Sequence, residues 1–194
     1  MRVMAGAPAT YGDLLALPEN MLGQILGGEL VATPRPANRH SLTASTLTAE
    51  LVGPFSLGRG GGPGGWWILD EPELHLGKDI LVPDLAGWRR DRLPEVPDEP
   101  FFTLAPDWIC EILSPSTAGI DRVRKMPIFA RERVGHAWLI DPAAMTFEVF
   151  RREGDRWLLL AAFGGDELAR AEPFEAIELP LGSLWPSASP VTGR

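Results

Sequence analysis

Residues 105–117 have the sequence APDWICEILSPST, which joins the pattern of a buried β-strand to the start of a helix. The apolar residues from 108 to 113 favour a strand, and the Ser-Pro-Ser-Thr that follows supplies capping groups for a helix around residues 119–132. Glu111 lies inside the apolar run, where an unpaired charge is costly. The stretch therefore predicts a strand and then a helix, with a buried acid that needs a partner.

Further strands are expected on both sides of this stretch. They are the segments rich in β-branched, aromatic and leucine residues: WWILDEP (66–72), DILVPDLAGW (79–88), HAWLID (136–141), TFEVFRR (146–152) and RWLLLAAF (156–163). A helix between strands is typical of an α/β fold, in which helices cover the faces of a sheet. We expect a mixed central β-sheet flanked by helices.

The N-terminal part predicts a short helix and a hairpin before the central sheet. Thr10 is a helix-capping residue, Pro18 ends the helix, and residues 21–32 form a hairpin that turns at a Gly-Gly pair. Asn38 is then expected to cap a second helix that packs on the sheet. Its apolar stripe contains Leu42, Ala44, Leu47, Ala49 and Leu51.

Length and composition set the scale of the fold. A chain of 194 residues with 45% hydrophobic residues is long enough for one domain with a proper core and too short for two comfortable ones. We expect a single domain over residues 1–186. Residues 187–194 are small, polar and Pro-containing, which predicts a flexible tail.

Charge and cysteine content narrow the classes of partner. The net charge of -8 provides no global positive field for a polyanion, so nucleic-acid binding must depend on a local patch or on a metal ion. The single cysteine, Cys110, rules out an internal disulfide, and the first ten residues do not have the pattern of a secretory signal. Because an apolar run long enough to span a bilayer is also lacking, we expect a cytoplasmic protein with no membrane role.

Two acids stand out because each adjoins an apolar strand pattern. Asp84 follows Pro83, and Glu111 is flanked by apolar neighbours. A divalent cation held by two carboxylates and a backbone carbonyl would offset the cost of burying them, although pairing of each acid with an arginine is the alternative. Asp107 also follows a proline, but it lies about 13 Å along the same strand from Glu111, too far to share one ion. Asp84 is therefore the better partner for Glu111.

Lys125 is notable because the chain uses lysine so rarely. Arginine occurs 16 times, whereas lysine occurs only at positions 78 and 125. An ammonium is a compact charge whose pKa can shift near a metal-bound water, which a guanidinium cannot match. An ordinary ion pair with Asp121, four residues earlier on the predicted helix, is the alternative. Pro127 should kink this helix because it removes the hydrogen-bond partner of the Val123 carbonyl.

Three motifs in this order resemble the bacterial "putative restriction endonuclease" family, once grouped as a domain of unknown function. They are Pro-Asp at 83–84, Glu-x-x-Ser-Pro-Ser-Thr from 111, and Asp-x-x-x-Lys from 121 to 125. The similarity runs from residue 27 through the EPFEAIELPLGSLW stretch. This family is similar to the PD-(D/E)XK nucleases, which implies a restriction-endonuclease-like core.

This sequence differs from the superfamily pattern at one position and from the family pattern at two others. The lysine commonly follows the second acid by two residues, but that position is Leu113 here, and the family resemblance implies that Lys125 takes its role. Phe129 stands where the family usually has tyrosine, and Gln24 where an acid is frequent. These departures affect accessory contacts and leave Asp84, Glu111 and Lys125 as the expected catalytic residues.

The resemblance also implies a chemistry, the metal-assisted hydrolysis of phosphodiester bonds in DNA. Asp84, Glu111 and the Ile112 carbonyl would hold Mg²⁺ or Mn²⁺, which stabilises charge growing on the phosphoryl oxygens and lowers the pKa of a bound water. Lys125 would orient that water or help to deprotonate it. Two alternatives remain open: a nuclease-fold binding or regulatory module without strong catalysis, which the acidic balance favours, and a transposon-associated nuclease that needs partner proteins.

The remaining polar and aromatic residues receive mostly structural interpretations. The histidines at 40, 75 and 136 have no second histidine or cysteine at metal spacing, although the family resemblance leaves His40 a place near the site. Glu29 and Glu73 are weaker candidates for supporting acids, and the arginines around Lys125 could place phosphates. The seven tryptophans recur in predicted strands, so we expect core packing or a homodimer interface.

Overall fold

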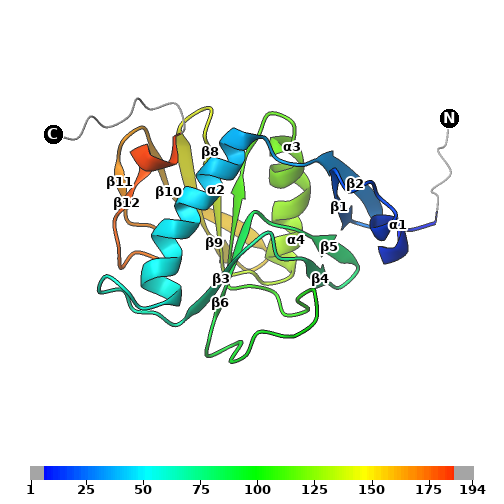
Figure 1. Ribbon diagram of the computed structural model, residues 1–194, viewed down its shortest axis with the longest axis horizontal. Helices are drawn as coiled ribbons and strands as arrows, with labels where there is room; N and C mark the ends of the chain where they lie inside the picture. Colours follow the sequence, from blue (N-terminus) through cyan, green and yellow to red (C-terminus); the bar gives the residue numbers. More distant parts are fainter. Residues whose placement is uncertain (1–6, 186–194) are drawn as a thin grey trace.

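The computed structural model describes residues 7–185, so the tail expected at 187–194 lies outside the described part of the chain. Within this range no helix has the length and apolar character needed to cross a membrane. Most of the elements are labelled in Figure 1. In chain order they are α1 (Tyr11–Leu15), β1 (Met21–Leu26), β2 (Glu29–Pro34), α2 (Asn38–Leu51), the π-helical turn η1 (Val52–Ser56), β3 (Trp66–Asp70), β4 (Leu74–Leu76), β5 (Asp79–Leu81), β6 (Leu85–Arg89), β7 (Trp108–Ile112), α3 (Ala118–Ile120), the π-helical turn η2 (Asp121–Lys125), α4 (Met126–Arg131), β8 (His136–Asp141), β9 (Thr146–Glu153), β10 (Arg156–Gly164), β11 (Leu168–Ala169), β12 (Leu179–Pro180) and the 3₁₀ turn η3 (Leu181–Leu184).

The central sheet has six strands in the order β10-β9-β8-β7-β6-β3. Its neighbouring strands are antiparallel except for β7 and β8, which are parallel. A parallel pair needs a crossover connection, and the helical segment α3–η2–α4 supplies it between these two strands. The predicted mixed sheet flanked by helices is confirmed.

Alternation along β7 sends its side chains to two different hydrophobic layers. Trp108 and Cys110 belong to the cluster under α2, whereas Ile109 belongs to the cluster that contains residues of α4. Because successive side chains of a strand point to opposite faces, Glu111 lies on the same face as Ile109. The acid in the sheet therefore faces the crossover helix that carries Lys125.

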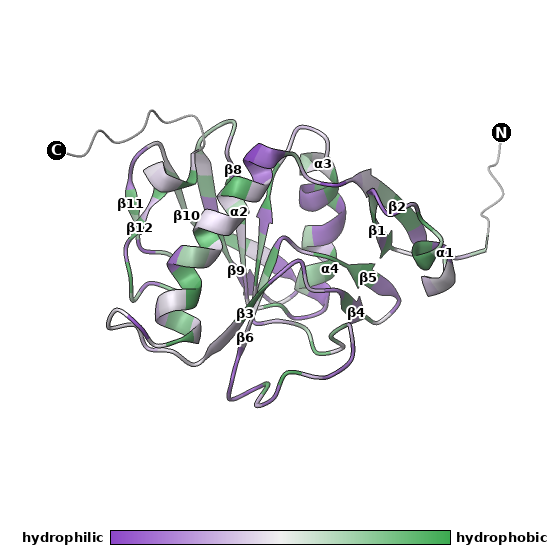
Figure 2. Cartoon of the chain, viewed as in Figure 1, coloured by the Kyte–Doolittle hydropathy of each residue, from purple (hydrophilic) through white to green (hydrophobic). Residues whose placement is uncertain are grey.

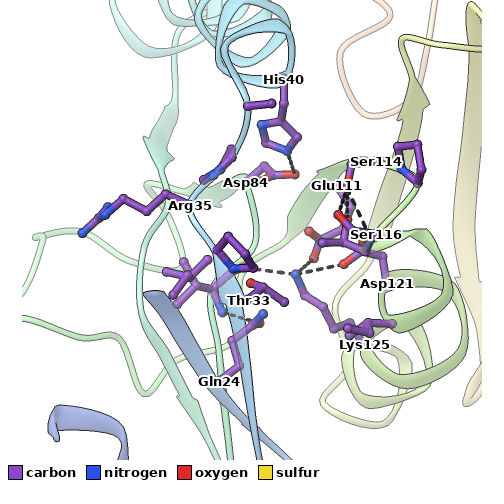
Figure 3. Close-up of a pocket in the computed structure, with 18 residues that line it drawn as sticks. Gln24, Thr33, Arg35, His40, Asp84, Glu111, Ser114, Ser116, Asp121 and Lys125 are labelled. Carbon is purple, nitrogen blue, oxygen red and sulfur yellow. Dashed lines mark hydrogen bonds and ion pairs between the residues drawn. The ribbon is translucent and has the colours of Figure 1, made fainter. Parts of the chain in front are cut away.

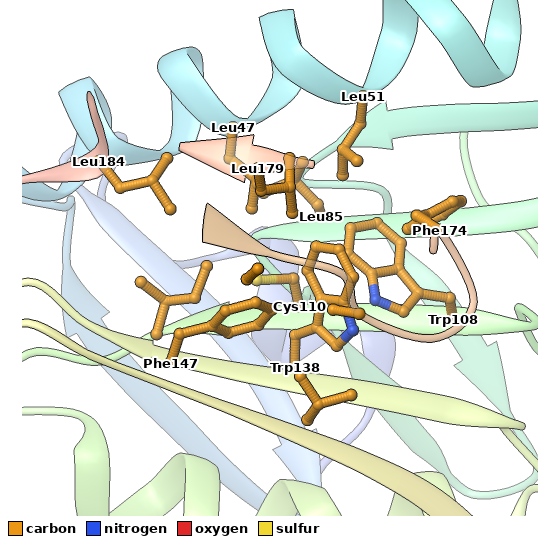
Figure 4. Packing of buried hydrophobic residues seen from close by; sticks show 14 of the residues in the cluster. Leu47, Leu51, Leu85, Trp108, Cys110, Trp138, Phe147, Phe174, Leu179 and Leu184 are labelled. Atoms are coloured by element: carbon orange, nitrogen blue, oxygen red, sulfur yellow. The ribbon is translucent and has the colours of Figure 1, made fainter. Parts of the chain in front are cut away.

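Helix α2 covers the other face of the sheet, as Figure 4 shows. Leu47 and Leu51 are fully buried there, while Leu42 is 53% exposed and Ala49 is also exposed, so the predicted apolar stripe is wrong at these two positions. The buried stripe instead continues through Thr43, at the helical spacing of four residues. In Figure 2 the apolar turns of α2 alternate with more polar ones along the helix.

The start of α1 agrees with the prediction from the sequence, whereas the start of α2 differs from it by one residue. Thr10 caps α1 in a capping box with Asp13, as predicted for Thr10. Helix α2 begins one residue earlier than predicted, because Ala37 has the extended backbone of the capping position and Asn38 is already helical. Within the described part of the chain, no side chain caps this helix start.

The predicted hairpin is confirmed, and it belongs to a second sheet. Strands β1 and β2 pair antiparallel, and β1 continues to β5 and β4 in a four-stranded sheet. The prediction of one strand over 79–88 is wrong, since β5 ends at Leu81 and β6 begins at Leu85 in the other sheet. Pro83 lies in this break, where its missing N–H cannot contribute to a ladder.

Asp79 fixes the hairpin to the rest of the protein. Its side chain is fully buried, accepts a hydrogen bond from the Gly27 N–H at the hairpin turn, and pairs with Arg131 of α4. Asp79→Ala removes both interactions and is expected to lower the free energy of unfolding by about 2 kcal/mol, measured by urea denaturation. Asp155→Ala, in the exposed β9–β10 turn, is the control and should change stability little. Equal urea midpoints for the two variants would show that Asp79 does not fix the hairpin.

Candidate active site

Asp84 lies in the break between β5 and β6, directly before β6 begins. The antiparallel β6–β7 ladder pairs Leu85 with Cys110. One residue further along, Asp84 therefore stands across from Glu111 on the neighbouring strand. The Ile112 N–H donates a hydrogen bond of 2.6 Å to Oδ2 of Asp84. The two acids and the Ile112 backbone thus lie together at the same end of these strands.

Lys125 connects the crossover helix to the sheet through Glu111. Its Nζ atom lies 2.6 Å from Oε1 of Glu111 and 3.4 Å from Oδ1 of Asp121. It also donates a hydrogen bond of 3.1 Å to the Val82 carbonyl (Figure 3). The side chains of Lys125 and Glu111 are only 3% and 2% exposed. The expected pair with Asp121 is present, but it is the longer of the two ion pairs.

The crossover helix reaches Lys125 through an irregular turn. Residues 121–125 are π-helical, and the Met126 N–H bonds to the Asp121 carbonyl five residues earlier. Pro127 follows directly and has no N–H for the Val123 carbonyl, which is a common cause of local irregularity. The expected disturbance by Pro127 therefore takes the form of a π turn within a continuous helical segment.

Neither of the two central acids contacts an arginine among residues 7–185, contrary to the arginine alternative. Glu111 is paired with Lys125, and Asp84 is 3.1 Å from Nε2 of His40. His40 lies in the first turn of α2, and no group among residues 7–185 forms a hydrogen bond with its buried Nδ1 atom. Burial alone would lower the pKa of His40, but the hydrogen bond and charge of Asp84 raise it above the usual value.

Three carboxylates surround a single lysine, which leaves an excess of negative charge. Burial raises the pKa of Glu111 well above its usual range despite the attraction of Lys125, and the charges of the other two acids add to the rise. Burial also raises the pKa of Asp121. For Lys125 burial acts in the lowering direction, but the carboxylates, Glu111 first, raise its pKa overall. One ammonium carries a single positive charge, fewer than the charges that the carboxylates of Asp84, Glu111 and Asp121 would carry together.

The donor atoms present fit a Mg²⁺ or Mn²⁺ ion. Oε1 of Glu111 is buried and, although close to Lys125, makes no hydrogen bond of ordinary geometry. Ile112 donates its N–H to Asp84 but does not line the cavity that holds the two acids, so its carbonyl stays a predicted ligand. No group of three or more His, Cys, Asp or Glu side chains suited to a metal occurs in the described part of the chain. Mg²⁺ does not require one, because it is often held by one or two carboxylates with water and substrate phosphates.

A cavity of about 310 Å³ is lined by Asp84, Glu111 and Lys125, together with His40 and Asp121. Figure 3 shows Asp84, Glu111 and Lys125 converging on it from separate elements. Its walls are completed by residues of the hairpin, of the linker into α2, of the β5–β6 break and of the loop after β7: Leu22, Gln24, Thr33, Pro34, Arg35, Pro36, Ala37, Val82, Ser114, Pro115, Ser116, Thr117 and Ile120. The hydroxyl groups of Ser114, Ser116 and Thr117 were not anticipated as wall groups, because their sequence is also that of an ordinary helix cap.

Several residues weighed from the sequence lie elsewhere. Asp107 accepts a hydrogen bond from the Arg89 N–H and pairs with Arg92, close to the opposite end of β7. Glu73 pairs with His75, and neither borders the cavity. Of the acids and histidines considered from the sequence, those that do not line the cavity are Glu29, Glu73, His75, Asp107 and His136.

The arginines of the crossover helix are largely engaged with acids. Arg122 pairs with Glu148 and Arg124 with Glu29, at 2.7 and 2.8 Å. Arg131 pairs with Asp79. These partners account for much of the basic charge near Lys125 without a phosphate.

The comparisons with known proteins agree with this architecture. The Uma2 family, described as "Putative restriction endonuclease", matches residues 12–182. A crystal structure of "a putative nuclease belonging to DUF820" from Anabaena variabilis ATCC 29413 is similar, with a TM-score of 0.74 and 24% sequence identity over 92% of this chain and 98% of the other. This likeness shows the fold alone, and the comparison with curated proteins gave no match. Since the family match spans most of the chain, the protein belongs to the Uma2 family.

Proposed function

We propose that the protein is a metal-dependent endonuclease that hydrolyses phosphodiester bonds in DNA. Its family membership supports a nuclease function in general. The observation that carries the finer proposal is the meeting of Asp84, Glu111 and Lys125 in one cavity, although they come from three separate elements. Two carboxylates beside a buried lysine are a set that can hold a cation and act on a phosphate.

Each residue has a distinct role in this proposal. Asp84, Glu111 and the Ile112 carbonyl hold Mg²⁺ or Mn²⁺, and the bound cation supplies a Lewis acid that offsets charge on the phosphoryl oxygens. Lys125 keeps the Glu111 carboxylate in place and presents its ammonium to the attacking water. His40 holds the Asp84 carboxylate through their 3.1 Å contact.

Metal removal is the direct test of this function. Purified protein is expected to nick or cut DNA in Mg²⁺ or Mn²⁺ and to lose cleavage completely in excess EDTA, because two carboxylates alone repel the phosphate. The measurement is gel electrophoresis of supercoiled plasmid and of circular single-stranded DNA, and restored cleavage after metal is returned is the control.

A folded protein that binds neither cation by calorimetry and cleaves no DNA or RNA would overturn the proposal. That outcome would favour the nuclease-fold binding module instead. Cleavage that persists unchanged in EDTA would equally exclude the metal-dependent mechanism.

A further inference from the structure

We propose that the cavity receives a single unpaired nucleotide, so that the substrate is single-stranded DNA or an unpaired segment of DNA rather than an intact duplex. This inference rests on the proposed nuclease function and names its substrate class. It is carried by the depth of the site, the size and chemistry of the cavity, and the distribution of positive charge.

The reactive groups lie at the bottom of the cavity. Glu111 and Lys125 are almost completely buried, and the Asp84 side chain is 16% exposed. A phosphate must therefore enter the cavity to reach them. The backbone of a duplex is part of a stiff, regularly stacked rod, whereas an unpaired strand can bend a single phosphate inward together with its nucleotide.

The cavity has the size and wall chemistry for one such unit. Its volume of about 310 Å³ is at the lower end of cavities that enclose small organic ligands. Apolar side chains such as Leu22, Pro36 and Ile120 can contact the face of a base. The Thr33 hydroxyl and the amide NH₂ of Gln24, whose Oε1 accepts a hydrogen bond from the Val82 N–H, can meet its edge. Such a mixture of apolar walls and a few polar groups is how unstacked bases are held.

The few basic side chains near the cavity can bind only a small number of phosphates. A protein that binds along a duplex neutralises many phosphates with Lys and Arg. Here the net charge is -8, and Arg122 and Arg124 are already paired with acids. Among the residues that line the cavity, Arg35 is the one arginine. Its guanidinium points away from Asp84, Glu111 and Lys125 in Figure 3 and its Nε atom bonds to the Glu19 carbonyl, so it can meet a phosphate only at the rim. One arginine fits a short contact with a flexible strand.

Binding of a 12-nucleotide single strand and of the matched 12-base-pair duplex tests the inference. Fluorescence anisotropy would be measured with Ca²⁺ in place of Mg²⁺, so that cleavage does not interfere. We expect the single strand to bind at least about tenfold more tightly than the duplex, the effect of one enclosed base. Ala37→Phe fills the exposed rim of the cavity and should weaken single-strand binding by about the same factor.

Ala32→Phe is the matched control, because Ala32 is exposed on β2 and does not line the cavity. It should leave binding unchanged. Duplex binding and cleavage equal to or better than that of the single strand would overturn the inference and leave the nuclease function intact, as would an Ala37→Phe variant with normal binding. Absence of binding to either DNA would also overturn it. Cavity-dependent single-strand binding without any cleavage in Mg²⁺ would support the inference while contradicting the proposed nuclease function.

Discussion

Lys125→Ala is expected to reduce DNA cleavage by about 10²–10⁴-fold, the usual contribution of a side chain that positions the attacking water for proton transfer. The ammonium is the positive group that contacts Glu111, so its loss also releases that carboxylate from its position. Initial rates of plasmid and single-strand cleavage in Mg²⁺ would be compared with wild type. Lys78→Ala is the natural control, since Lys78 is the only other lysine in the chain and is exposed.

The same substitution should also weaken the fold, so folding must be checked separately. Removing one partner of a buried ion pair commonly costs about 3–5 kcal/mol, because the other charge remains buried. The folded-state pKa of Glu111 is already raised by burial. The folded protein therefore tolerates the protonated acid, and the loss of stability in Lys125→Ala should increase as pH rises through the folded-state pKa of Glu111.

Lys125→Arg separates these two effects. It keeps a positive charge beside Glu111, so it should be more stable than Lys125→Ala at neutral pH. Because the planar guanidinium does not match the compact ammonium that positions the water, cleavage should still fall by at least about 10²-fold. Wild-type rates in both variants would exclude a catalytic role for Lys125.

Local patterns in the sequence indicated Asp84 and Glu111, whereas the family resemblance was needed to place Lys125 with them. Glu111 is marked by an apolar strand in which a free charge is costly, and Lys125 by the rarity of lysine in this chain. A strand followed by a helix and a parallel strand places the helix over one sheet face, and strand alternation then decides which side chains it meets. Strand alternation and the strand–helix–strand connection involve residues close together in the chain, so the sequence alone can indicate them.

Other parts of the site depend on contacts between distant segments. His40 and Asp84 are 44 residues apart, and their contact is decided by how α2 lies across the end of the sheet. The hairpin becomes a wall of the cavity because Asp79 binds it to α4. No local periodicity encodes such packing, so the sequence indicated the acids and the lysine without indicating the enclosed cavity around them.

Pro83 lies in a break between two strands, where a single strand was expected from the sequence. A single strand over 79–88 was expected because apolar residues continue on both sides of the proline. In the structure the chain changes sheets there, and the Val82 carbonyl and the Asp84 carboxylate on either side of Pro83 both bond within the site. The missing N–H of proline thus separates two ladders and exposes backbone and side-chain groups to the cavity.

Glu111→Gln is expected to abolish metal binding and cleavage without weakening the fold. Glutamine has nearly the same shape but lacks the negative charge that a divalent cation requires, so the heat of Mn²⁺ binding in calorimetry should disappear and cleavage should fall by at least about 10²-fold. Glu153→Gln makes the same change at an exposed position of β9 and should retain both properties.

The expected stability of Glu111→Gln follows from the charge balance of the site. Asp84 and Asp121 remain near Lys125, so the lysine keeps carboxylate neighbours, while the repulsion among the three neighbouring acids is reduced. The thermal midpoint should therefore stay within about 2–4 °C of wild type or rise, which corresponds to no more than about 1 kcal/mol of lost stability for a chain of this size. A large fall in the midpoint would mean that Glu111 serves mainly as a structural partner of Lys125. Retained Mn²⁺ binding together with normal cleavage would exclude Glu111 as a metal ligand, because a neutral amide cannot replace the carboxylate charge at that position.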